Sequence, residues 1–257
     1  MPSVAALLRA AAAAAALFLA PALQAAELKV VSSFGFAEAD KAAFAEFERQ
    51  TGNKVILELG PSMGETQAAI PARLGRGEDI DALTMVGYAL EKLVQQGKVD
   101  DHADIARSLI GAVVKQGAPA PDISTVDKLR QALLNARSIA VSDSASGVYI
   151  QKEMFKKLGI EDQVKSKVRV IPGDPVAGAV AKGEAEIGFQ QISELKPVAG
   201  VTMLAPLPAE VQDVTTYAAG VVASSKQKDA ARALVRFLAS PAAAKAITDS
   251  GMEPIKQ

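Results

Sequence analysis

The sequence contains no cysteine and no tryptophan, and its single histidine is His102. The absence of cysteine excludes disulfides, thiol nucleophiles, iron–sulfur clusters and zinc held by thiolates. One histidine excludes zinc sites built from two or three histidines, and a Ser-His-Asp triad would have to use His102. Composition therefore removes most metal-dependent and covalent mechanisms, and we expect a protein with no metal and no cofactor.

Aromatic residues and net charge are also scarce. Only 4% of the 257 residues are aromatic, and the formal net charge is −1. A nucleic-acid groove normally shows a basic excess, and a base-stacking platform needs aromatic side chains. We therefore expect no nucleic-acid partner. The lysines between Lys152 and Lys167 have too few aromatics among them to suggest one, and they are typical of a solvated face.

The first 26 residues have the pattern of a secretory signal. Arg9 is their only charge, and an apolar run covers Ala10–Ala20. The run is too short to remain anchored in a bilayer. Small residues allow cleavage after Ala22, Ala25 or Ala26. Cleavage after Ala25 or Ala26 is favoured, because the mature chain then starts just before the first strand-like run. Since no cysteine is available for lipid attachment, the segment predicts a soluble protein exported to the periplasm.

The remaining sequence alternates strand-like runs with amphipathic stretches. Short apolar runs predict strands at Leu28–Ser32, Val55–Leu59, Ala82–Val86, Leu109–Val114, Ser138–Val141, Val168–Ile171, Glu186–Gln190, Val201–Ala205 and Thr215–Val222. Helical spacing between them predicts helices from Phe36 to Gly52, over Glu65–Leu74 and Tyr88–Gln96, after a Ser124 cap, over Val148–Leu158 and Pro175–Lys182, and on both sides of Ser240-Pro241. This alternation is typical of α/β architecture.

The order of these elements indicates two lobes. One lobe takes residues 27–113 together with 217–257, and the other takes residues 114–216. The chain leaves the first lobe through Leu109–Val114 and returns through Thr215–Val222. Bending at two such crossovers opens and closes a cleft between the lobes. We therefore predict a ligand-trapping architecture.

Four turns rich in hydroxyls, amides and small residues follow predicted strands. They are Ser32–Gly35, Gly60–Gly64, Ser142–Tyr149 and Gln190–Ser193. Ligands of α/β sheets gather at the carboxyl ends of strands, where backbone N–H groups at helix starts favour anions. Helix capping alone explains any one of these turns. Together they predict a cleft that holds a compact anion with uncharged donors.

Two charged features allow more than one interpretation. Asp100-Asp101-His102-Ala103-Asp104 reads as a polar turn, which predicts a solvated histidine rather than a catalytic base. Arg73 and Arg76 either pair with Glu78 and Asp79 on the surface or reach a ligand carboxylate.

With these turns the sequence resembles the molybdate-type periplasmic solute-binding proteins of ABC importers, from Leu28 to Gly251. The resemblance implies a two-lobed type 2 periplasmic-binding fold with two crossover hinge strands and a central ligand cleft. It also implies a monomer that delivers its anion to an inner-membrane permease. The implied ligand-binding residues are Ser33, Phe34, Ser62, Met63, Gly64, Ser144, Ala145, Ser146, Gly147, Val148, Tyr149, Gln190, Gln191 and Tyr217.

The sequence departs from the molybdate-type pattern at three places. Met63 is inserted before Gly64, the strand after Ala82 runs into Val86-Gly87-Tyr88-Ala89, and Gln190-Gln191 replaces a Thr/Ser-Asp pair. These departures question molybdate as the ligand and leave an anion-binding cleft intact.

The same strings resemble a molybdate-like subgroup that includes a periplasmic aconitate isomerase. That resemblance implies a proton and double-bond shift, which needs a base near the allylic carbon and donors for the developing enolate. The proton-transfer candidates are Asp143, Glu65 and Tyr149.

These observations lead to one main hypothesis and an alternative. The main hypothesis is a periplasmic solute-binding protein that captures a di- or tricarboxylate or a molybdate-like oxyanion for an ABC importer. The alternative is a cofactor-free aconitate isomerase on the same scaffold. A sensory anion binder is a third, less favoured function.

Overall fold

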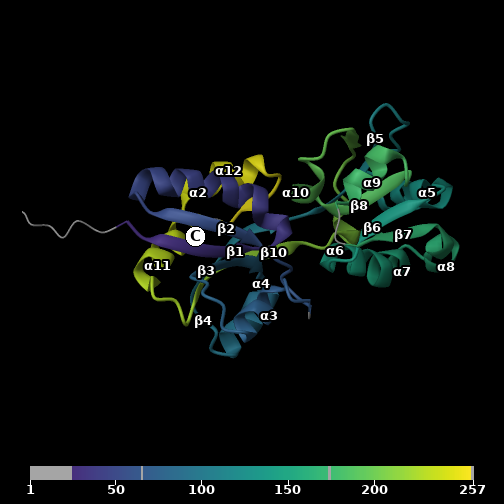
Figure 1. Ribbon diagram of the computed structural model, residues 1–257. Helices are drawn as coiled ribbons and strands as arrows, with labels where there is room; N and C mark the ends of the chain where they lie inside the picture. Colours follow the sequence, from purple (N-terminus) through teal and green to yellow (C-terminus); the bar gives the residue numbers. More distant parts are fainter. Residues whose placement is uncertain (1–24, 65, 173–174, 256–257) are drawn as a thin grey trace, which may run out of the picture.

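The computed structural model describes residues 25–64, 66–172 and 175–255, which form two lobes that lie side by side (Figure 1). Within these ranges the first sheet has the strand order β11-β4-β10-β3-β1-β2, and the second has the order β7-β6-β8-β5-β9. The predicted two-lobed α/β architecture is confirmed. The predicted signal, residues 1–26, lies almost wholly outside the described residues.

The first lobe carries a mixed sheet. Its strands are β1 (Glu27–Ser32), β2 (Lys54–Leu59), β3 (Ala82–Val86), β4 (Val99–Ser108), β10 (Thr215–Val222) and β11 (Glu253–Pro254). β1 lies parallel between β2 and β3, whereas β10 is antiparallel to β3 and β4. Its helices are η1 (Phe34–Phe36), α2 (Ala37–Thr51), α3 (Ile70–Gly75), α4 (Gly87–Gln95), α11 (Lys228–Leu238), η5 (Pro241–Ala243) and α12 (Ala244–Asp249).

The second lobe is built around a smaller sheet. Its strands are β5 (Ile110–Lys115), β6 (Ile139–Ser142), β7 (Val168–Ile171), β8 (Ile187–Gln191) and β9 (Val201–Met203). β6 is parallel to β7 and β8, and β5 is antiparallel to β8 and β9. Its helices are α5 (Val126–Asn135), α6 (Ala145–Tyr149), η2 (Ile150–Met154), α7 (Phe155–Lys157), α8 (Glu161–Val164), η3 (Lys165–Lys167), α9 (Val176–Lys182), α10 (Ile192–Leu195) and η4 (Ala209–Val211).

Apolar side chains at helical spacing attach the helices to each sheet. In α2, Ala39, Ala43 and Phe47 recur on one face and are fully buried. The helix ends at Gly52, whose φ of 76° is costly for residues with a Cβ. The Phe47 ring meets Phe237 of α11 edge-on at 5.5 Å, so the C-terminal helices share the core of the first lobe. None of the helices in the described ranges is long and apolar enough to cross a membrane.

Two crossovers connect the sheets. β4 in the first sheet is followed after one residue by β5 in the second, and β10 returns the chain to the first sheet. Residues 110–113, which the sequence prediction assigns to the first lobe, therefore pair in the second sheet. The Gln212 side chain accepts a hydrogen bond from Ile110 N at 2.8 Å and donates to Ile110 O at 3.0 Å. This amide ties the two crossovers together.

Three local expectations are wrong. His102 lies inside strand β4, opposite Gly220 of β10, rather than in a polar turn. Acidic residues have low strand propensity, but pairing with a neighbouring strand overrides it. The helix predicted from Glu65 begins only at Ile70, with Pro71 in its first turn. Helix α5 is capped by Thr125, whose hydroxyl accepts from Lys128 N, and not by Ser124.

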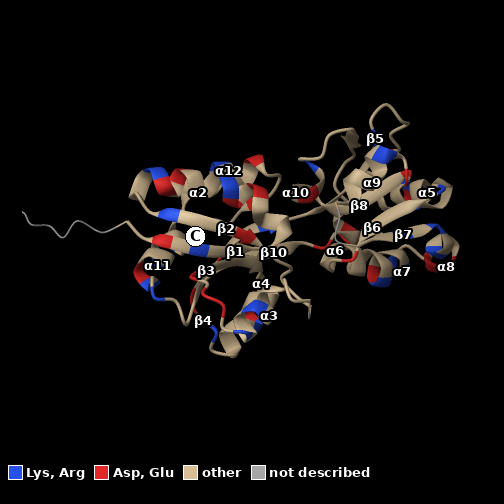
Figure 2. Ribbon diagram, viewed as in Figure 1, with Lys and Arg blue, Asp and Glu red and all other residues tan. Residues whose placement is uncertain are grey.

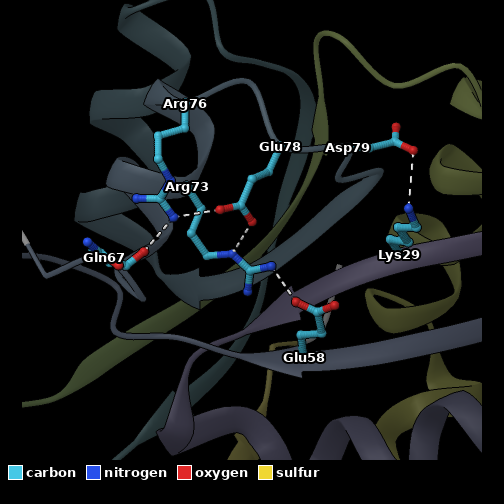
Figure 3. Close-up of polar contacts among 7 residues, drawn as sticks. All are labelled: Lys29, Glu58, Gln67, Arg73, Arg76, Glu78 and Asp79. Atoms are coloured by element: carbon cyan, nitrogen blue, oxygen red, sulfur yellow. Dashed lines mark hydrogen bonds and ion pairs between the residues drawn. The ribbon is translucent and has the colours of Figure 1, made fainter.

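Asp81 is a buried carboxylate that connects three segments of the first lobe. Its Oδ2 accepts from Lys29 N of β1 at 2.9 Å, and its Oδ1 accepts from the Ser225 hydroxyl at 2.6 Å. Asp79, two residues earlier, is exposed and meets the Lys29 ammonium at 3.3 Å (Figure 3). The two neighbouring acids therefore differ in burial and in the bonds that they accept.

We expect Asp81→Ala to lower the free energy of unfolding by about 2–4 kcal/mol, because it leaves a buried N–H and a hydroxyl without their charged acceptor. Asp79→Ala is the matched control and removes only an exposed ion pair, so it leaves stability unchanged within error. Urea denaturation of both variants is the measurement. Equal stability of the two variants would contradict this role of Asp81.

Candidate functional site

In the first lobe, the turns that follow three adjacent strands meet at one edge of the sheet. Ser33 N donates to Thr84 O at 2.8 Å, which fixes the turn after β1 against β3. Ser62, after β2, accepts with its Oγ from Val86 N at 3.1 Å. Both serines are buried, and Ser33 Oγ has no hydrogen-bond partner among the described residues. The first two predicted turns are thus brought together, with an unused hydroxyl between them.

In the second lobe, three serines gather where α6 begins after β6. The Ser142 hydroxyl lies 2.7 Å from that of Ser144 and 3.3 Å from that of Ser146. A Cβ at Gly147 would lie 1.8 Å from Ser142 O, so only glycine lets the helix pack this closely on the strand end. The third predicted turn is therefore a compact group of hydroxyls.

The two glutamines at the end of β8 hold neighbouring segments. Gln190 accepts with its Oε1 from Val176 N and donates with its Nε2 to Glu194, both at 2.9 Å. Gln191 donates with its Nε2 to Thr215 Oγ1 at 2.8 Å, while its Oε1 is buried and has no partner within the described ranges. The fourth predicted turn thus reaches from the second lobe to the start of β10.

The first and fourth turns meet across the two lobes. The Ser193 hydroxyl of α10 donates to Gly35 O of η1 at 2.7 Å. The Tyr217 ring of β10 lies 5.6 Å from Phe36, and a Cβ at Gly35 would lie 1.9 Å from the Tyr217 hydroxyl oxygen. Tyr217 therefore lies directly behind the Ser33 turn, at the junction of the lobes.

Glu194 is a residue of this junction that sequence reasoning missed. It is half-buried in the first turn of α10. Burial raises the pKa of its carboxyl to about 7, against the hydrogen bond from Gln190, and the negative charge of Asp143 raises it further. Burial also raises the pKa of Tyr217 well above its usual range, and Glu194 adds to that effect. A lone acid after a strand of ordinary composition gave only a weak sequence signal.

Asp40 is a second missed acid, buried in α2 behind the Ser33 turn. The Thr84 hydroxyl donates to its Oδ2, and its Oδ1 has no partner among the described residues. Burial raises the pKa of Asp40 to about 7, and the hydrogen bond from Thr84 opposes this. Asp40 is fully buried, so its carboxyl is not accessible to a ligand.

Other predicted residues are exposed on the turns or have their polar groups engaged elsewhere. Phe34, Met63 and Val148 are large apolar side chains, 50%, 37% and 42% exposed. Tyr149 directs its hydroxyl to Val211 O at 3.0 Å and accepts from the Lys157 ammonium at 3.1 Å. Its hydroxyl is therefore engaged away from the serine turns.

The remaining predicted residues lie in or next to the turns, or outside the described residues. Gly64 has a φ of 98°, Ala145 opens α6, and Asp143 is exposed just before it. Glu65 lies outside the described residues. In Figure 2, the red that marks Asp and Glu is seen on the ribbon at α10 and in the loop that leads to α6. Within the described ranges no group of three or more His, Asp or Glu side chains is arranged to hold a metal ion.

A hollow of about 570 Å³ lies next to the predicted turns rather than at them. It is formed by α4, β4 and the start of β10, and its lining includes Tyr88, His102, Asp213 and Thr215. The turns are the candidate site because Ser193 joins two of them across the lobes, and because the charge of Asp143, beside the serine turn, reaches Glu194. Thr215, which accepts a hydrogen bond from Gln191, belongs to the lining of this hollow and adjoins the fourth turn.

Arg73 and Arg76 pair with acids of their own lobe. Arg73 donates to Glu58 and Glu78, and Arg76 donates to Glu78 and to Gln67 O (Figure 3). The expected pairing with Glu78 is confirmed. Because these pairs neutralise both guanidinium groups, the turns themselves supply the uncharged donors of the site.

Comparison with known proteins gives consistent similarities. The model of a family described as bacterial extracellular solute-binding protein matches residues 28–253. The chain is 45% identical over 230 residues to an aconitate isomerase of Pseudomonas sp., which covers 89% of this chain and 88% of the relative. It is 28% identical over 257 residues to the molybdate-binding protein ModA of Azotobacter vinelandii, with 91% and 92% covered.

Solved structures show the same fold at lower identity. The periplasmic molybdate-binding protein of Azotobacter vinelandii matches with a TM-score of 0.71 at 20% identity, covering 90% of this chain and all (100%) of that one. Peb3 of Campylobacter jejuni matches with a TM-score of 0.64 at 15% identity, covering 88% and 99%. These likenesses identify the two-lobed fold as the type 2 periplasmic-binding fold.

We expect Asp40→Asn to flatten the dependence of stability on pH. The folded state keeps the Asp40 proton up to about pH 7, whereas the unfolded chain loses it near its ordinary pKa of 3.8. The contribution of Asp40 to the free energy of unfolding is therefore fully present at pH values below its unfolded pKa. It falls by up to about 1.4 kcal/mol per pH unit as the pH rises from there to 7. Asparagine can still accept from Thr84. Urea denaturation at several pH values would refute the role of Asp40 if both proteins gave the same slope.

Proposed function

Because the chain belongs to the bacterial extracellular solute-binding protein family, we propose that its two lobes bind aconitate and interconvert the cis and trans isomers. One observation carries this proposal above the others. The 45% identity to the Pseudomonas aconitate isomerase extends over 89% of the chain, far above the 28% identity to ModA. The proposed location is the periplasm, in line with the predicted signal.

The reaction needs no group that this composition lacks. Removing a proton from the methylene carbon of aconitate leaves a negative charge delocalised over three carbons and a carboxylate. Returning a proton to the former vinylic carbon shifts the double bond, and the new bond forms in either geometry. Hydrogen-bond donors aimed at the carboxylate lower the barrier by stabilising the delocalised charge. The reaction therefore requires an acid–base group and donors, both available from carboxyl, hydroxyl and amide side chains.

The donors of the site suit a multiply charged organic anion. Ser33 and Ser62 lie in the turns of the first lobe, and the hydroxyls of Ser144 and Ser146 lie in the turn before α6 of the second. Neutral hydroxyl and N–H donors hold carboxylates while leaving the charge of the substrate unneutralised. A proton-transfer group in the site thus keeps a raised pKa.

The mouth of the site favours a carbon skeleton over a tetrahedral oxyanion. Phe34 and Met63 project from the first-lobe turns and Val148 from the second-lobe turn, and all three are substantially exposed. Closure of the lobes would bury this apolar surface, which an organic ligand covers favourably. Molybdate offers no apolar surface to match it.

A second candidate function is capture of a small anion for an ABC importer. The family itself and the similarity to ModA support it. The same turns and the same closure would serve both functions, so measured turnover decides between them.

We expect purified protein lacking residues 1–26 to convert trans-aconitate to an equilibrium mixture with cis-aconitate, and to reach the same mixture from either isomer. Ultraviolet absorbance and proton NMR would follow the reaction without added metal or cofactor. Calorimetric binding of aconitate without turnover would instead support the importer. Molybdate, tungstate, sulfate and citrate complete the binding panel.

Replacement of the two facing serines tests where aconitate binds. We expect Ser62→Ala and Ser146→Ala each to weaken binding about tenfold, as loss of one charge-assisted hydrogen bond costs about 1.5 kcal/mol or more. Ser166→Ala, an exposed serine of η3, is the control and leaves the Kd unchanged. Wild-type affinity in the double serine variant would place the site elsewhere.

A further inference from the structure

We propose that Glu194 is the catalytic base that removes the aconitate proton from one carbon and returns it to the other. This role rests on the proposed isomerase function. Glu194 replaces Asp143, Glu65 and Tyr149, the candidates suggested by the sequence.

The surroundings of Glu194 hold its carboxyl at the junction of the lobes. Gln190 Nε2 donates to its Oε1 at 2.9 Å, which fixes one oxygen. The adjacent Ser193 donates to Gly35 O of η1 at 2.7 Å, which holds α10 against the first lobe. Gln190 thus positions the carboxyl from β8, and Ser193 places the first turn of α10 against the first lobe.

Burial and the negative charge of Asp143 keep the proton affinity of Glu194 high, whereas the hydrogen bond from Gln190 lowers it. Asp143 faces it from the loop before α6, Tyr217 faces it from β10, and Gln190 faces it from β8. Burial is the largest cause of the raised pKa, and no lysine or arginine of the described residues lowers it. A carboxyl with a pKa of about 7 populates both protonation states near neutral pH, which suits a group that must accept and then donate a proton.

The other titratable groups nearby suit different roles. Asp40 is fully buried in the core behind the Ser33 turn and does not reach a ligand. Tyr149 has its hydroxyl engaged with Val211 and Lys157. Tyr217 keeps its proton because burial raises its pKa far above neutrality, so it is suited to donate a hydrogen bond.

One side chain, Glu194, carries out both proton transfers of the proposed reaction. The Glu194 carboxylate takes a proton from the methylene carbon, the C–H bond breaks, and its electron pair is delocalised over the allylic carbons and the attached carboxylate. The protonated Glu194 then gives this proton to the former vinylic carbon, and the double bond forms on the other side. No atom is gained or lost, nothing is oxidised or reduced, and the carboxylate is regenerated.

Glu194→Gln tests this role in the whole exported protein. Glutamine keeps an acceptor for Gln190 but cannot take a proton. We expect kcat for trans-aconitate to fall at least about 100-fold, while the Kd measured by calorimetry changes less than about threefold. Glu184→Gln is the matched control, since Glu184 is exposed just before the opposite end of β8, and both constants stay unchanged.

The pH profile and the exchange of deuterium provide independent readouts. In the wild-type protein kcat/KM rises as pH rises through about 7, because only the ionised carboxyl accepts the proton. Glu194→Asp restores part of the activity lost in Glu194→Gln. In heavy water, wild-type product gains deuterium at the methylene carbon while part of the original proton is retained, and Glu194→Gln slows isomerisation and exchange together.

The possible results distinguish a failure of the proposed role of Glu194 from a failure of the proposed isomerase function. Wild-type kcat in Glu194→Gln would overturn this role of Glu194 and leave the isomerase function intact. Equal losses of affinity and kcat in this variant would also overturn the role, again without affecting the isomerase function. A wild-type protein that binds aconitate but does not isomerise it would overturn the proposed function, and this role of Glu194 with it.

Discussion

Hydrogen bonds between the two crossovers are the constraint on which the site depends. Gln212 pairs with both backbone groups of Ile110, and Gln191 pairs with Thr215. The side-chain amides of Gln212, before β10, and of Gln191, at the end of β8, thus satisfy polar groups that would be costly to leave buried and unpaired. These bonds set the strand ends of the second lobe against those of the first. A shift at either crossover would separate α10 from η1, and the donors would no longer face one ligand.

The electrostatics of the junction follow from the same arrangement. Arg73 and Arg76 are paired with Glu58 and Glu78, and the side-chain donors within the predicted turns are hydroxyls and amides. An acid that is removed from water keeps its proton to higher pH, and a hydrogen bond from a neutral donor opposes this only in part. This explains why Glu194 and Asp40 both have pKa values raised to about 7, although one lies at the junction and the other lies in the core.

Local sequence patterns predicted the parts of the fold that depend on short-range physics. Gly52 ends α2 because its left-handed φ is costly for other residues, and the apolar run Ala82–Val86 forms a buried strand. The Ser62 and Ser146 turns follow strands, as the α/β pattern indicates. Strand β4 was missed because its acids disfavour a strand until β10 pairs with them. Tyr149 was placed in the site as part of the Ser142–Tyr149 turn and by the family resemblance, whereas packing turns its hydroxyl toward Val211.

The sequence by itself determined the α/β alternation, the two-lobed organisation and the serine-rich turns, since these follow from hydrophobic periodicity and from the conformational preferences of small residues. Tertiary structure decided which acids matter. Burial and neighbouring charge set the proton affinity of a carboxyl, and both depend on residues far apart in the chain. Glu194 acquires its environment from burial, Gln190 and Asp143, and its own charge raises the pKa of Tyr217, which β10 brings close from a distant part of the chain.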